Sequence, residues 1–65
     1  MKVRGVIKLI EAEGWQLDRQ SGSHRQFTHL TRRGVTTVAG HPGDDVHPKT
    51  LGSIMKQAGI RRTSQ

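Results

Sequence analysis

Among the residues that could carry chemistry in this chain, His24 has the most informative surroundings. It follows Gly22 and Ser23 directly. Imidazole is the side chain best suited to proton transfer near neutral pH. A glycine–serine turn allows backbone and hydroxyl groups to approach a phosphate closely. His24 is therefore the candidate catalytic residue, and the alternative is an ordinary surface histidine that follows a turn.

Thiol and metal chemistry have less support in the sequence. The chain has no cysteine, which excludes a thiolate nucleophile, a disulfide framework and a cysteine-ligated zinc. His29 lies five residues beyond His24, so regular alternation puts the two side chains on opposite faces of a strand. That placement argues against a metal site shared by these two histidines.

A second group of candidate metal ligands lies in a loop, where His41 and His47 flank a pair of aspartates. A metal site needs convergent geometry as well as suitable residue types, and we expect none here. His47 directly precedes Pro48 and is expected to begin a helix, because proline is tolerated in the first helical turn. Asp44 and Asp45 are expected to cap the loop or to face solvent.

Two amphipathic helices are predicted, one near each end of the chain. Val3, Val6 and Ile10 recur at the spacing of one helix face, which predicts a helix over 3–10. Gly14 is the stop expected just past its C-terminus. A second apolar stripe follows Pro48 and ends before Gly59; it consists of Leu51, Ile54, Met55 and Ala58.

Between the helices, three segments alternate in polarity or are rich in β-branched residues. They predict strands over 15–19, 24–30 and 35–39. The short connections between them imply an antiparallel meander. The predicted order is α-β-β-β-α, an α+β two-layer sandwich with both helices on one face of a three-stranded sheet.

The alternation of side chains along the second strand decides where His24 lies. Phe27 is the natural core residue of this strand, and Arg25 shares its face. His24, Gln26 and Thr28 share the other face. His24 is therefore expected on the open face of the sheet or at its rim, and Arg25 is expected to leave the core side at the sheet edge.

Length and composition limit the kind of site that this chain can build. With 65 residues it is expected to form one domain over 1–65, with its core at about 3–60 and a basic tail at 61–65. A domain of this size buries only about 60% of the surface of its unfolded chain, so any site must be shallow. No apolar run approaches the roughly 20 residues that cross a bilayer, and no signal-peptide cleavage site is visible. We expect a soluble, untargeted protein with no membrane partner.

The formal net charge of +6 points to a polyanionic partner. Nucleic acid is the first candidate and an acidic protein the second, and both could use the same basic surface. Trp15 is expected in the core rather than on the surface as a platform for stacked bases.

Four motifs occur in order along most of the chain: Glu13-Gly14-Trp15, Arg19-Gln20-x-Gly22-Ser23-His24-x-x-Phe27, Val38-x-x-His41 and Leu51-x-x-Ile54-x-Lys56-Gln57-Ala58-Gly59. Together they resemble the HicA (YcfA-like) toxin family, the small RNA-cleaving partners of HicA–HicB toxin–antitoxin systems. The resemblance implies a fold like that of a double-stranded RNA-binding domain, ribosome-independent cleavage of mRNA, a HicB-like antitoxin as partner and a cytoplasmic location. His24 matches the family's catalytic histidine. Ala39 stands where many members have proline.

RNA carries its own nucleophile, the 2′-OH, so a shallow site without a metal or other cofactor is sufficient for its cleavage. We hypothesise that His24 acts as general base on the 2′-OH or as general acid toward the 5′-oxygen. Ser23 or nearby N–H groups would contact the phosphate, and Arg25 or Lys49 would supply positive charge. The second proton-transfer group is not identified. The alternatives are a non-catalytic double-stranded RNA-binding module and a basic protein that only docks an acidic partner.

Overall fold

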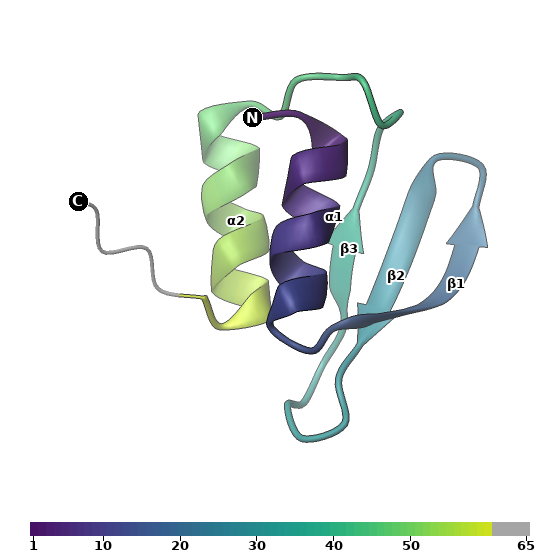
Figure 1. Ribbon diagram of the computed structural model, residues 1–65, viewed down its shortest axis with the longest axis vertical. Coiled ribbons are helices and arrows are strands. Elements are labelled where there is room, and N and C mark those ends of the chain that lie inside the picture. The colour runs from purple at the N-terminus through teal and green to yellow at the C-terminus, as the bar shows by residue number, and fades with distance from the viewer. Residues whose placement is uncertain (61–65) are drawn as a thin grey trace.

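Two helices pack side by side against one face of a three-stranded antiparallel sheet in the computed structural model, which describes residues 1–60 (Figure 1). The elements, in chain order, are α1 (Val3–Ala12), β1 (Gln16–Ser21), β2 (His24–Thr28), β3 (Thr36–Val38) and α2 (Pro48–Ala58). The sheet order is β1-β2-β3. The predicted α+β class and the α-β-β-β-α order are confirmed, and the predicted basic tail lies outside the described residues.

The start of α1 is held by the loop that precedes α2. The N–H of Val3 donates to the carbonyl oxygen of Asp44 at 2.9 Å, and the N–H of Arg4 donates to that of Pro42 at 3.1 Å. These bonds satisfy donors that have no partner within the helix. The side chain of the N-cap residue, Lys2, makes no capping hydrogen bond, so the loop before α2 supplies these acceptors.

The start of α2 is capped by its own preceding residue. Nδ1 of His47 accepts a hydrogen bond from the N–H of Lys49 at 3.2 Å, and Pro48 occupies the first turn, where its missing N–H has no cost. The prediction that His47 begins this helix is confirmed. In the same loop, Asp44 accepts from the N–H of His41 at 3.0 Å, which confirms the capping role predicted for that aspartate.

The strand boundaries differ from the prediction for local reasons. β1 extends to Ser21 because the turn to β2 has only two residues, Gly22 with φ of 58° and Ser23. Glycine at the first central position is what a type II′ hairpin turn requires. β2 ends at Thr28 rather than at residue 30, because the next side chain, His29, takes up backbone N–H groups of the following loop.

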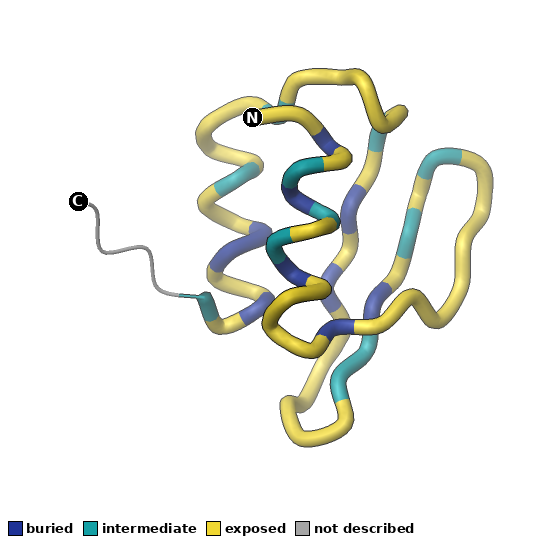
Figure 2. The backbone as a smooth tube through the Cα atoms, in the orientation of Figure 1, coloured by how far each residue is buried: buried dark blue, intermediate teal, exposed yellow. Residues whose placement is uncertain are grey.

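The core lies between the sheet and the two helices (Figure 2). Its buried residues are Val3, Val6, Ile10, Trp15, Phe27, Val38, Ile54 and Ala58. Trp15 is only 1% exposed, so its predicted place in the core is confirmed. Thr36 is also fully buried, and its hydroxyl has no hydrogen-bond partner among the described residues.

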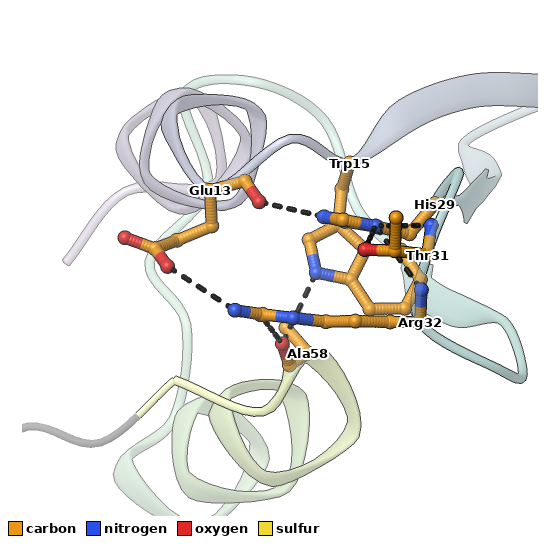
Figure 3. Close-up of polar contacts among 6 residues, drawn as sticks. All are labelled: Glu13, Trp15, His29, Thr31, Arg32 and Ala58. Atoms are coloured by element: carbon orange, nitrogen blue, oxygen red, sulfur yellow. Dashed lines mark hydrogen bonds and ion pairs between the residues drawn. The ribbon is translucent and has the colours of Figure 1, made fainter.

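A polar cluster ties the C-terminal ends of both helices to the loop between β2 and β3 (Figure 3). The carbonyl oxygen of Ala58 accepts from the Trp15 indole at 3.1 Å and from Arg32 at 2.6 Å. Nδ1 of His29 accepts the N–H groups of Thr31 and Arg32, so its Nε2 carries the proton and donates to the Glu13 carbonyl at 2.8 Å. Both ring nitrogens of His29 are therefore used in hydrogen bonds within this cluster.

Two glycine-to-alanine changes are expected to shift stability in opposite directions. Gly14 has φ of 97°, and a Cβ there would lie 2.6 Å from Nε2 of His29. Gly14→Ala should therefore lower the free energy of unfolding by about 2 kcal/mol. Gly52 lies inside α2 with open space around it, and Gly52→Ala should raise the same quantity by about 0.5–1 kcal/mol. Urea unfolding measures both, and equal shifts would contradict the structure.

The orphaned hydroxyl of Thr36 predicts a stabilising substitution. Thr36→Val removes a buried hydroxyl that has no hydrogen-bond partner within residues 1–60 and should raise the free energy of unfolding by about 1 kcal/mol. Thr37 is the matched control, because it neighbours Thr36 on β3 and is exposed. Thr37→Val should change the unfolding free energy by less than about 0.5 kcal/mol. Urea unfolding of both variants is the measurement, and a destabilised Thr36→Val would show that the hydroxyl has a partner in solution.

Candidate active site

His24 lies at the start of β2, on the face of the sheet that the helices leave open. Burial alternates along this strand: His24 and Gln26 are exposed, Arg25 is half-buried and Phe27 is buried. Since Phe27 points toward the helices, the residues of the other parity point away from them. The alternation therefore placed His24 correctly from the sequence.

A β-bulge in β1 determines which residues of that strand share this open face. Leu17 pairs with Phe27, but the next pair joins Arg19 to Gln26, with the register shift at Asp18 between them. Directly opposed residues of an antiparallel pair point to the same face. Without the bulge, Asp18 would lie opposite Gln26. With it, an arginine takes that place instead of a carboxylate.

The open face has a shallow hollow beside His24. It is lined by Arg19, Gln20, Ser21, His24 and Gln26, and its volume is about 110 Å³. Pockets that enclose a whole drug-sized ligand have about 300–1,000 Å³. This hollow can therefore seat a single group of a larger ligand, while the rest of the ligand lies on the sheet.

The side chains around the hollow are mostly accessible to a ligand. The Arg19 side chain is 80% exposed, and its only ion pair among residues 1–60 is a 3.6 Å contact with exposed Asp18, which contributes little to stability. The Gln20 side chain, in contrast, has a partner within the protein, because its Nε2 donates to the Gly22 carbonyl at 3.0 Å. That bond braces the turn that leads into His24.

None of the three residues predicted for phosphate contact lines the hollow. Ser23 directly precedes His24 in the turn, as the sequence requires. Arg25 lies on the helix-facing side, and its Nη1 donates to the Gly40 carbonyl at 2.9 Å. Lys49 lies in the first turn of α2, which Figure 1 places on the opposite side of the molecule from the β1–β2 turn. Only His24, of the residues predicted for the site, lines the hollow.

Sequence reasoning missed Arg19 as a member of this site. Gln26 was recognisable, since it shares the parity of His24 on one strand. The position of Arg19 depends on the bulge, and no glycine at this point in the sequence signals one.

Two further features bear on the chemistry of this surface. Within residues 1–60, no three histidine, aspartate or glutamate side chains lie close enough together to hold a metal ion. Neither α1 nor α2, the helices of this described region, has the length and apolar character needed to cross a membrane.

Comparison with known proteins identifies the family of this chain. A search of curated proteins found no match. A family model, that of the HicA toxin of bacterial toxin–antitoxin systems, matches residues 3–60, which include both helices, all three strands and the turn that precedes His24. Because that match covers most of the chain, the protein belongs to the HicA toxin family of toxin–antitoxin systems.

Proposed function

We propose that this protein is the toxin of a type II toxin–antitoxin system and cleaves mRNA with His24, without a metal ion. One observation carries the proposal: in a member of the HicA family, an exposed histidine lines a shallow hollow together with an arginine and polar side chains. The mRNA substrate puts the activity in the cytoplasm. A HicB-like antitoxin neutralises the toxin.

The reaction needs little from the protein because the substrate supplies the nucleophile. The 2′-oxygen of one ribose attacks the adjacent phosphorus, and the bond from phosphorus to the 5′-oxygen of the next nucleotide breaks. One proton leaves the 2′-OH and one reaches the departing 5′-oxygen. The His24 imidazole performs one of these transfers, as general base or as general acid, and its exposed ring supports this role.

Charge on the phosphorane intermediate requires a nearby cation and hydrogen-bond donors. Arg19 is the arginine that lines the same hollow as His24, and a guanidinium matches two phosphate oxygens at once. The turn before His24 adds the hydroxyl of Ser23 and backbone N–H groups. Lys49 does not line this hollow, so we assign it a contact with RNA backbone away from the reacting phosphate.

The charge of the protein supports both proposed partners. A net charge of +6 on 65 residues favours binding to the phosphate backbone of RNA. The same charge favours an acidic antitoxin, and an antitoxin seated on the open face would exclude RNA from His24.

Replacing His24 tests the catalytic proposal directly. His24→Ala should lower the rate of RNA cleavage by about 10²–10⁴-fold, since a general acid–base group contributes that factor. The measurement is cleavage of single-stranded RNA by purified protein in the presence of EDTA. His41→Ala is the control, because His41 is exposed and lies outside the hollow, and it should retain the wild-type rate.

The same assay separates the competing functions. Discrete products from the wild type in EDTA support the metal-independent nuclease. Retention of duplex RNA without cleavage would instead support the non-catalytic RNA-binding module. If the protein neither cleaves nor retains RNA, the result favours a protein that only docks an acidic partner. Wild-type cleavage by His24→Ala would remove this histidine from the mechanism.

The contribution of Arg19 is measurable through salt dependence. Each phosphate contact on single-stranded nucleic acid adds about 0.7 to the magnitude of the slope of log affinity against log salt concentration. Arg19→Ala should reduce that magnitude by about 0.7 and weaken RNA binding. Arg33→Ala, a change at an exposed arginine in the β2–β3 loop, is the charge-matched control. If Arg33→Ala reduced the magnitude of the salt slope more than Arg19→Ala does, the RNA would bind nearer the β2–β3 loop than the hollow.

A further inference from the structure

Arg25 directly follows His24 in the chain, but its side chain lies on the opposite face of the sheet from His24. It pairs with Val38 of β3 and is half-buried on the helix side of the sheet. Its Nη1 donates to the Gly40 carbonyl at 2.9 Å and makes a longer contact of 3.5 Å with the Ser23 carbonyl. One guanidinium nitrogen thus lies between two carbonyl oxygens from segments far apart in sequence.

Gly40 is hydrogen-bonded both to Arg25 and to the turn that precedes His24. Its N–H donates to the carbonyl oxygen of Ser23 at 3.2 Å, while its own carbonyl accepts from Arg25. Gly40 has φ of 109°, and a Cβ there would lie 3.3 Å from Cγ2 of Val3. The residue that holds the turn is therefore itself packed closely on α1.

The loop beyond Gly40 is anchored on the first turn of α1. The Asp44 carbonyl accepts from the Val3 N–H, and the Pro42 carbonyl accepts from the Arg4 N–H. Arg4 adds a side-chain bond to the same Pro42 oxygen at 3.4 Å. The loop is therefore hydrogen-bonded to the first turn of α1 at Pro42 and Asp44, and to the peptide that precedes His24 at Gly40.

We propose that Arg25 is a positioning residue for His24. By binding the carbonyls of Gly40 and Ser23, it fixes the peptide that leads into His24 and so holds the imidazole in the hollow. Its catalytic consequence rests on the nuclease function proposed above. A misplacement of about 1 Å costs about 100-fold in rate, so loosening this peptide should lower kcat more than it changes KM.

The first test needs no RNA. Amide hydrogen exchange of the free protein reports the bond from Gly40 N–H to Ser23. In Arg25→Ala, exchange at Gly40 should accelerate by at least about tenfold while the Val6 amide in α1 keeps its wild-type rate. Arg25→Lys should give an intermediate acceleration, because an ammonium lacks the planar fork of a guanidinium. Unchanged exchange at Gly40 in Arg25→Ala would overturn the proposal.

The second test separates positioning from direct contact with a phosphate. Arg25→Ala should lower kcat by about 10–100-fold and leave KM and the salt slope of RNA binding at wild-type values. A loss of about 0.7 in the magnitude of that slope, with kcat unchanged, would make Arg25 a phosphate ligand and overturn the positioning role. Arg25→Lys should recover part of kcat, and Arg33→Ala should leave kcat unchanged.

The two tests also keep the proposals apart. If the wild type cleaves no RNA, the nuclease function fails, and hydrogen exchange still decides whether Arg25 holds the turn. If the wild type cleaves RNA and Arg25→Ala loosens Gly40 without lowering kcat, the nuclease function stands and the positioning role is wrong.

Discussion

The carbonyl oxygen of Ala58 is the acceptor on which the packing of this small domain depends. It receives the indole N–H of Trp15, which follows α1, and the guanidinium of Arg32, which comes from the β2–β3 loop. The last carbonyls of a helix have no partner within it, and a cation is favoured near them. A single carbonyl at the end of α2 thus joins three segments through two hydrogen bonds. The buried Trp15 ring adds its apolar area to the same junction.

The opposite end of the molecule is held by backbone carbonyls rather than by aromatic packing. The loop before α2 caps the first N–H groups of α1 and reaches the β1–β2 turn through Gly40. A 65-residue chain has a small core, so such polar contacts decide where its surface segments lie. The turn that precedes His24 is thus hydrogen-bonded to the loop between β3 and α2.

The shallow open face matches the chemistry proposed for it. A domain this small has no room for a deep pocket, and its hollow of about 110 Å³ seats one group of a ligand. Cleavage of RNA suits that limit, because the 2′-OH belongs to the substrate and the protein supplies only proton transfer and positive charge. The positive charge reaches the open face through the bulge at Asp18, which puts Arg19 opposite Gln26.

The amino-acid sequence by itself determined the element order, the two apolar helix faces and the open-face parity of His24. These properties follow from periodicity within one helix or strand, where neighbours in sequence are neighbours in space. Only the tertiary structure decided that Arg19 joins the hollow, that Arg25 turns toward Gly40 and that Lys49 lies outside the hollow. A one-residue bulge reverses the alternation of every residue beyond it, and the acceptor for a long side chain is set by a segment that folding brings to it. Such contacts produce no periodic pattern in the sequence, so they cannot be predicted from it.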